Sequence, residues 1–318
     1  MKRLIALILA CLMLLGLCAC GGNETPGGAN LNGADATADP TVDPNYDPVN
    51  NDKTLKVLAI GNSFSNDTTH FLEDIAKAEG FETILIGNLY ISGCTLQTHA
   101  LNVESNVPAY KFYMNYDGEW KTIQDCTLDY ALKNQDWDII TMQQGSKWSG
   151  KPESYEPHLT KLIEYVNKNK TNPNARLAWN MTWAYQSDFE KDMFAQYARN
   201  QDVMYHAIIS TVQSTVQKHT EISYIMPCGT AIQNARTSYV GDTLTRDGYH
   251  MSEMGRVITS YTWLATFLNE PLTQINFTNV SENLTLTDQD KAMILEAVNN
   301  AIKTPFAVTN STYTEVNE

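Results

Sequence analysis

The chain has 318 residues, with 36 Asp and Glu against 22 Lys and Arg, so its formal net charge is −14. This acidic balance, with a sequence pI of about 4.8, argues against nucleic acid as a partner, because phosphate binding needs a basic surface. At 43% hydrophobic and 18% charged residues, the composition is that of a globular protein long enough to bury a substantial core. Six cysteines are too few for a disulfide scaffold.

The first twenty residues predict an export signal. Two basic residues precede an apolar run from Leu4 to Leu17, which has the length of a signal-peptide core and is too short to span a bilayer comfortably. The following Leu17-Cys18-Ala19-Cys20 resembles a bacterial lipoprotein processing site, which implies cleavage before Cys20 and lipidation of its sulfur. We therefore expect a signal peptide at residues 1–19 and a protein anchored to a bacterial membrane at the cell surface or in the periplasm. A plain secretory signal is the alternative.

The segment after the signal has the composition of a spacer. Residues 21–53 hold five Gly, four Pro and six acidic residues, and Asp-Pro recurs every four residues from Asp39 onward. Such a sequence favours an extended, flexible chain, so we expect a linker over residues 20–53. The folded domain is expected at residues 54–305, followed by a tail at 306–318.

Short apolar runs alternate with helical patterns through the folded part. Strands are expected at residues 55–60, 83–91, 137–142, 175–183 and 222–226, and helices at 71–78, 155–169, 188–218, 252–268 and 287–302. Alternating aromatic residues that turn at Asp117-Gly118 predict a β-hairpin over residues 110–124. This order predicts a three-layer α/β/α sandwich with a mainly parallel five-stranded sheet and the hairpin as an insertion.

The residues that follow the predicted strands suggest chemistry, because ligands of parallel α/β sheets bind beyond the carboxyl ends of the strands. Ser63 follows the first strand in the sequence G-N-S-F-S, and Gly93 follows the second. Asp247 and His250 lie three apart on a turn before a late helix, where the carboxylate could orient the imidazole toward a serine. Taken singly, Ser63 could be a helix cap and the Asp-His pair a surface turn. No dinucleotide, P-loop or G-x-S-x-G motif occurs at these positions.

Together these blocks resemble the SGNH (GDSL-like) hydrolases over about residues 54–268. The resemblance implies an SGNH/flavodoxin-like fold and ester hydrolysis with Ser63 as nucleophile, His250 as general base and Asp247 orienting the imidazole. It also implies an oxyanion hole that includes the backbone N–H groups of Ser63 and Gly93. No metal or organic cofactor is expected.

The third block departs from that family pattern, because Gln143-Gln144 stands where G-x-N-D is usual. A Gln amide can donate to an oxyanion as Asn does. We expect Gln144 to be the third oxyanion donor, with Gln143 as the alternate. Adjacent side chains on a strand point to opposite faces, so only one of the two should reach the site.

Residues after the fourth and fifth strands predict a sugar-binding rim, namely Trp183, Gln186, Asn234 and Arg236. Edge packing is the alternative role for the aromatic residue. The favoured interpretation is a lipid-anchored carboxylic ester hydrolase that acts on an O-acetylated carbohydrate. The alternative is a non-catalytic surface lipoprotein that binds glycan through the same cleft.

The remaining histidines and cysteines carry no motif. The other five histidines lack metal-ligand spacing such as H-E-x-x-H, so no metal site is expected. At most one disulfide could form in the mature chain, and the sequence does not select a pair among Cys94, Cys126 and Cys228. The sequence also leaves the oligomeric state, the acyl group and the alcohol of the substrate open.

Overall fold

The structure, a computed structural model, describes residues 43, 45–49, 53–116 and 118–316. The predicted signal peptide, Cys20 and most of the predicted linker lie outside these residues, so they stay predictions. Within the described ranges, no helix is both long enough and apolar enough to cross a membrane.

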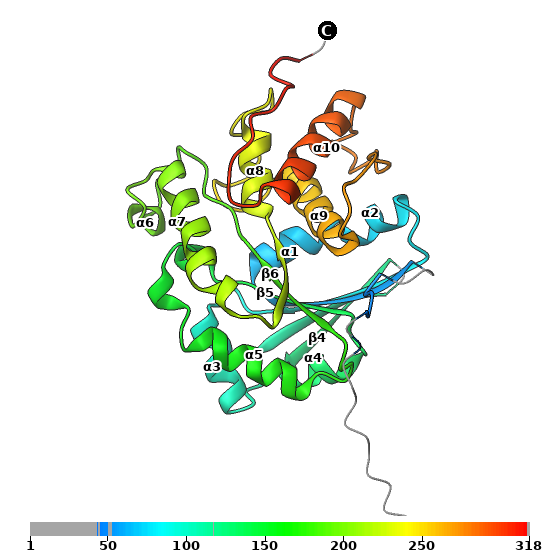
Figure 1. The fold of residues 1–318 in the computed structure, drawn as a ribbon, viewed down its shortest axis with the longest axis vertical. Helices are drawn as coiled ribbons and strands as arrows, with labels where there is room; N and C mark the ends of the chain where they lie inside the picture. Colours follow the sequence, from blue (N-terminus) through cyan, green and yellow to red (C-terminus); the bar gives the residue numbers. More distant parts are fainter. Residues whose placement is uncertain (1–42, 44, 50–52, 117, 317–318) are drawn as a thin grey trace, which may run out of the picture. The chain divides into compact units, whose positions relative to one another are not determined.

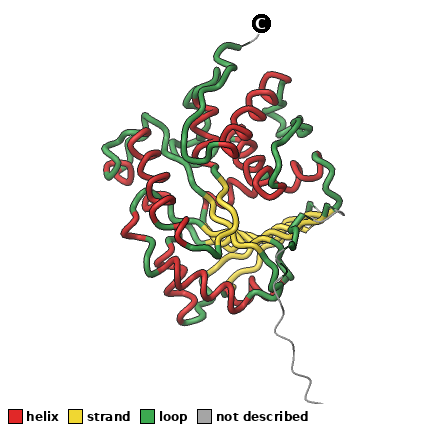
Figure 2. Tube along the Cα trace, in the orientation of Figure 1, coloured by secondary structure: helices red, strands yellow, loops and turns green. Residues whose placement is uncertain are grey.

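Seven strands of the described chain form one sheet in the order β4-β3-β2-β1-β5-β6-β7. Figure 2 draws the strands in yellow, with helices on either side. They are β1 (Thr54–Gly61), β2 (Thr83–Tyr90), β3 (Tyr110–Tyr116), β4 (Glu119–Cys126), β5 (Ile139–Met142), β6 (Arg176–Asn180) and β7 (Ile222–Met226). The strands β2, β1, β5, β6 and β7 run parallel, which confirms the predicted five-stranded parallel sheet. The hairpin β3–β4 pairs antiparallel with β2, so it extends one edge of this sheet rather than standing apart as an insertion.

Helices cover both faces of the sheet and give three layers (Figure 1). One face carries α1 (Ser63–Thr69), α2 (Leu72–Ala78), α8 (Cys228–Arg236), α9 (Glu253–Leu268) and α10 (Asp288–Lys303). The other face carries α3 (Leu96–Glu104), α4 (Leu128–Asn134) and α5 (His158–Asn169). The segment after β6 forms α6 (Asp192–Ala195) and α7 (Gln201–Ser214), and short 3₁₀ turns lie at Ser146–Trp148, Pro152–Ser154 and Val216–Lys218.

The sequence pattern does not predict α1, α3, α4 or α8. Each has nine residues or fewer, which is too short for a clear helical period. The longer helices agree with the prediction, but the helical stretch expected over residues 188–218 is divided into α6 and α7, and the Asn200 side chain caps α7. Thr287 and Asp290 form a capping box at the start of α10.

The centre of the sheet determines where the site lies. Strand β1 lies between β2 and β5, and its side chains Leu55, Val57 and Leu58 are fully buried because helices cover both faces. Ser63 begins α1 two residues after β1 ends, so it lies at the carboxyl edge of the parallel sheet, where ligands bind.

Part of the predicted linker packs on the domain. The Tyr46 hydroxyl donates to the Asp138 carboxylate and accepts from Asn172 Nδ2 at 3.2 Å, and the Tyr46 carbonyl accepts from Arg176 Nη2 at 3.0 Å. Burial, together with the hydrogen bond to Asp138, raises the pKa of Tyr46 to about 12. The end of the expected linker therefore belongs to the folded part. The expected tail is also bound, since the Thr309 N–H donates to Asn234 Oδ1 at 2.7 Å.

Deleting residues 21–53 is expected to lower the Tm by about 2–8 °C. The deletion removes Tyr46 and its hydrogen bonds, which together contribute about 1–2 kcal/mol. Deleting residues 21–39 is the matched control and should leave the Tm nearly unchanged, because it keeps Tyr46. Thermal melts followed by circular dichroism measure both, and equal Tm values for the two deletions would contradict this role of Tyr46.

Candidate active site

The structure brings Ser63, His250 and Asp247 together at the carboxyl edge of the sheet. The Ser63 Oγ lies 2.9 Å from His250 Nε2, and His250 Nδ1 lies 2.7 Å from Asp247 Oδ2. Ser63 is the first residue of α1, whereas Asp247 and His250 lie on the loop before α9. This chain of hydrogen bonds is the arrangement in which a carboxylate orients an imidazole that takes the proton of a serine.

Asp247 is held as an ionised acceptor. The backbone N–H groups of Tyr249 and His250 donate to its Oδ1 at 3.3 and 2.8 Å. Burial alone would raise the pKa of Asp247, but the hydrogen bonds from the His250 ring and backbone outweigh it and hold the pKa below its usual range. The carboxylate is therefore charged at neutral pH and favours a proton on Nδ1, which leaves Nε2 to accept from Ser63.

Gly248 makes the turn between Asp247 and His250 possible. Its φ is +91°, a conformation that side chains disfavour, and a Cβ there would lie 2.3 Å from the Phe189 ring. The Gly248 carbonyl also accepts from the Gln186 N–H at 2.8 Å. The Asp-Gly pair thus sets the short spacing that lets one turn carry both Asp247 and His250.

Trp183 packs in the core against the loop that carries Asp247 and His250, and not at a substrate rim. Its side chain is fully buried, its ring stacks on Phe64 at 4.2 Å, and its Nε1 donates to the Tyr249 carbonyl at 2.8 Å. The Tyr249 ring in turn packs on His250 at 3.8 Å. The prediction that Trp183 contacts substrate is wrong, because the ring supports the loop from the core.

Asp67, one helical turn after Ser63, ties α1 to the loop that carries Asp247 and His250. Its Oδ2 accepts from the Met251 N–H at 2.9 Å, and its Oδ1 pairs with Arg246 at 2.8 Å and with Arg256 at 2.9 Å. The Asp67 side chain is only 1% exposed. Since Arg246 and Met251 flank the Asp-Gly-Tyr-His turn, this carboxylate fixes the loop against the helix.

A cavity of about 350 Å³ opens beside Ser63 and His250, and Asn62 and Gly93 also line it. Among the described residues, no acceptor pairs with the backbone N–H of Ser63 or of Gly93. Gly93 has a φ of +62°, and a Cβ there would meet no atom within 4 Å, so the backbone conformation and not packing requires glycine. Two unpaired N–H groups on the lining residues are suited to holding an oxyanion.

Gln144 does not line this cavity. Its Oε1 accepts from the N–H groups of Leu96 and Gly145, both at 2.9 Å, and its Nε2 donates to the carbonyl and hydroxyl of Ser154. Both ends of the carboxamide are thus paired, and Gln144 lines a different cavity together with Ser154. The prediction of Gln144 as the third oxyanion donor is therefore wrong, because its amide is hydrogen-bonded to Leu96, Gly145 and Ser154.

Gln143, the alternate candidate for the third oxyanion donor, contacts the site through Asn62. Its Oε1 accepts from Asn180 Nδ2 at 2.9 Å, and its Nε2 donates to Asn62 Oδ1 at 2.8 Å. Asn62 caps α1 by accepting from the Phe64 N–H at 3.0 Å and donates to the Cys94 carbonyl at 2.9 Å. Gln143 is thus a positioning residue that acts through Asn62, which holds the turns bearing both unpaired N–H groups.

Gln144→Ala is expected to destabilise the fold without slowing chemistry. The substitution leaves the Leu96 N–H and the Ser154 carbonyl unpaired in the interior, at a cost of about 2–4 kcal/mol in unfolding free energy. The kcat on a small ester should stay within about threefold of wild type, well short of the roughly 10²-fold loss that removing an oxyanion donor causes. A large fall in kcat with an unchanged denaturation midpoint would restore Gln144 as a donor.

The other predicted rim residues lie away from the triad cavity. Asn234 is buried and donates to the Ala297 carbonyl on α10, and Arg236 pairs with Asp242 at 2.8 Å. Burial lowers the pKa of Arg236 to about 10. Both therefore have structural roles, which corrects their prediction as rim residues. Gln186 lines a different cavity, which Asp247 also lines.

The sequence reasoning missed the roles of Asn62 and Asp67. Asn62 carried a signal, because Asn directly before a helix is a preferred cap. Asp67 carried none, since its arginine partners lie 179 and 189 residues away in the chain.

The three described cysteines form no disulfide. Cys94, Cys126 and Cys228 are free thiols, all buried. No group of three or more His, Cys, Asp or Glu that could hold a metal ion occurs within the part of the chain that the structure describes.

Comparisons with known proteins give a family but no assigned activity. Residues 56–292 match the family model described as Domain of unknown function (DUF4886). The crystal structure of a DUF4886 family protein from Bacteroides uniformis matches with a TM-score of 0.77 and 37% identity, over 82% of this chain and 100% of that one. A comparison with curated proteins gives no match.

Two more distant structures are named as esterases. A family 3 carbohydrate esterase from Clostridium thermocellum matches at 15% identity and a TM-score of 0.42, over 68% of this chain and 96% of that one. A catalytic mutant of an acetylxylan esterase from Geobacillus stearothermophilus matches at 13% identity and a TM-score of 0.43, over 67% of this chain and 94% of that one. These similarities are too weak to transfer an activity. The match to the family model and the 37% identity to the Bacteroides uniformis protein show that the chain belongs to the DUF4886 family.

Proposed function

We propose that this protein is a serine hydrolase of carboxylic esters. The observation that carries the proposal is the continuous chain from Asp247 through His250 to the Ser63 hydroxyl, with both contacts under 3 Å. It lies beside a cavity whose lining includes two backbone N–H groups without an acceptor among the described residues. Nucleophile, base, orienting acid and oxyanion donors are the parts that acyl transfer needs.

In this mechanism the Ser63 Oγ attacks the ester carbonyl carbon, and His250 Nε2 takes the hydroxyl proton. The N–H groups of Ser63 and Gly93 hold the oxyanion that develops. When the intermediate collapses, the ester C–O bond breaks and His250 gives the proton to the leaving alcohol. His250 then takes a proton from a water molecule, whose oxygen attacks the acyl carbon. The bond between this carbon and Ser63 Oγ breaks, His250 returns the proton to Ser63 Oγ, and the carboxylic acid leaves.

The substrate we propose is an O-acylated carbohydrate outside the cytoplasm, with the enzyme anchored by lipid on Cys20. This rests on the SGNH-like motifs and the lipoprotein-like N-terminus of the sequence. A non-catalytic glycan-binding module would not require Ser63 and His250 to meet. Their separation of 2.9 Å supports the enzyme over that alternative.

The test is a fluorophosphonate label followed by peptide mapping. We expect the label on the peptide that contains Ser63, and no labelling of that peptide in the His250→Ala variant, because the nucleophile loses its base. Absence of label on wild-type Ser63, under conditions that modify a control hydrolase, would overturn the proposal.

A further inference from the structure

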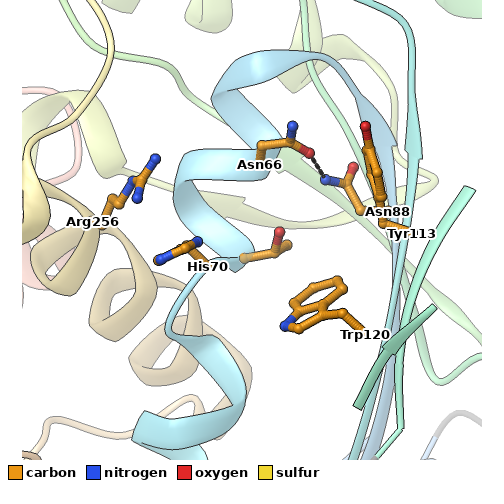
Figure 3. Close-up of a pocket in the computed structure, with 7 residues that line it drawn as sticks. Asn66, His70, Asn88, Tyr113, Trp120 and Arg256 are labelled. Carbon is orange, nitrogen blue, oxygen red and sulfur yellow. Dashed lines mark hydrogen bonds between the residues drawn. The ribbon is translucent and has the colours of Figure 1, made fainter. Parts of the chain in front are cut away.

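A second cavity of about 330 Å³ lies between α1 and the β3–β4 hairpin (Figure 3). Asn66 and His70 line it from α1 and the residue that follows it, Arg256 lines it from α9, and Tyr113 and Trp120 line it from the hairpin. None of these side chains takes part in the mechanism described above.

The strand register directs the hairpin aromatics to the face that looks toward α1. Asn88 lies opposite Tyr113 across β2 and β3, and Asn115 lies opposite Trp120 across β3 and β4. Because strand side chains alternate, Tyr113 and Trp120 project from the same face of the hairpin. The Trp120 side chain is 46% exposed, so its ring is available to a ligand.

Hydrogen-bonding groups surround these rings. Asn66 Oδ1 accepts from Asn88 Nδ2, which leaves the Asn66 amide N–H groups for a ligand (Figure 3). In the described ranges, the Tyr113 hydroxyl and the Trp120 indole N–H have no hydrogen-bond partner either. The cavity thus combines aromatic faces with unsatisfied polar groups, which is the composition of a small-molecule site.

The charges of this cavity favour an uncharged ligand. Arg256 is already paired with the buried Asp67 at 2.9 Å, so its charge is compensated. Burial, and then the charge of Arg256, lower the pKa of His70, so the imidazole is neutral at pH 7. Hydroxyl groups suit such a lining better than phosphate does.

The second cavity and the triad cavity are lined by residues that contact each other. Tyr90 lines the triad cavity, and its ring lies 5.6 Å from that of Tyr113, which lines the second one. Asn66 and His70 lie three and seven residues after Ser63, or roughly 5 and 10 Å along the helix axis. A ligand that occupies both cavities must therefore be elongated.

We propose that this hairpin cavity is a subsite for a further sugar ring of an O-acylated oligosaccharide whose ester lies at Ser63. The apolar face of the ring would stack on Trp120, and its hydroxyls would reach Asn66, Tyr113 and His70. The inference rests on the proposed esterase function, and it assigns the substrate class as an oligosaccharide ester rather than a simple ester or a monosaccharide ester.

The test compares wild type, Trp120→Ala and Tyr116→Ala on O-acetylated gluco-oligosaccharides of one to four rings. Tyr116 is a matched control, because it is an aromatic side chain, 63% exposed, on the opposite face of the same hairpin. Wild type and Tyr116→Ala should both show kcat/KM rising roughly tenfold from one ring to the longer substrates, mainly through KM. Trp120→Ala should lose this rise, and Trp120→Phe should restore part of it.

Calorimetric titration of Ser63→Ala with unacetylated cellotetraose separates the subsite from turnover. Adding Trp120→Ala to that background should weaken binding roughly tenfold. Kinetics independent of chain length, together with binding that Trp120→Ala does not weaken, would overturn the subsite even in an active esterase. Binding that depends on Trp120 in a protein that cleaves no ester would support the subsite and overturn the esterase function instead.

Discussion

Ser63→Ala is expected to lower kcat on any ester substrate by on the order of 10⁶, because the nucleophile and its base act as a unit. His250→Ala should cost about as much, since the Ser63 hydroxyl then keeps its proton. The double variant should be little slower than either single one. Initial rates on p-nitrophenyl acetate, with Ser223→Ala on the exposed side of β7 as the control, measure these effects.

Asp247→Asn tests the orienting role within the same unit. An Asn side chain does not favour a proton on His250 Nδ1 as the Asp247 carboxylate does. The kcat should therefore fall by on the order of 10⁴, which is less than the loss for Ser63→Ala or His250→Ala. Losses at Ser63 and His250 that multiply in the double variant would mean that the two side chains do not share one step.

Asp67→Asn is expected to lower both stability and turnover. It removes the charge that pairs with Arg246 and Arg256, and breaking a buried pair typically costs 3–5 kcal/mol. Since the Arg246 side chain is 42% exposed, we expect about 3 kcal/mol, or a Tm lower by about 6–12 °C. The loop that carries Asp247 and His250 then loses its tie to α1, and a displacement of about 1 Å can lower kcat by roughly 10².

The control for Asp67 is Asp129→Asn, which breaks an i,i+4 pair with Lys133 on the surface of α4. That pair should be worth less than about 0.5 kcal/mol, with no effect on kcat. Denaturant melts give the stability change, and rates measured well below the Tm give kcat. If Asp67→Asn lost stability but kept wild-type kcat, the carboxylate would be only structural.

The sequence alone determined the parts of the site that depend on residues close together in the chain. The first strand and the polar turn after it placed Ser63 at the carboxyl edge of the sheet, because an apolar run that ends at Gly-Asn-Ser cannot continue as a buried strand. Asp247 and His250 are three residues apart, so a single turn brings them together whatever the rest of the chain does. The five parallel strands followed from apolar runs that both faces of the sheet bury.

Only the tertiary structure decided which buried polar groups face the site. The amide of Gln144 bonds to Leu96, which begins α3, and to Ser154, and the sequence beside Gln144 does not predict that these groups meet its side chain. Trp183 looks like a rim residue in the sequence but stacks on Phe64 in the core. The role of Asp67 depends on partners 179 and 189 residues away. Such contacts form only when the helices and the sheet pack together. A buried polar group must pair with whichever partner the folded chain places beside it, and the local sequence does not specify that partner.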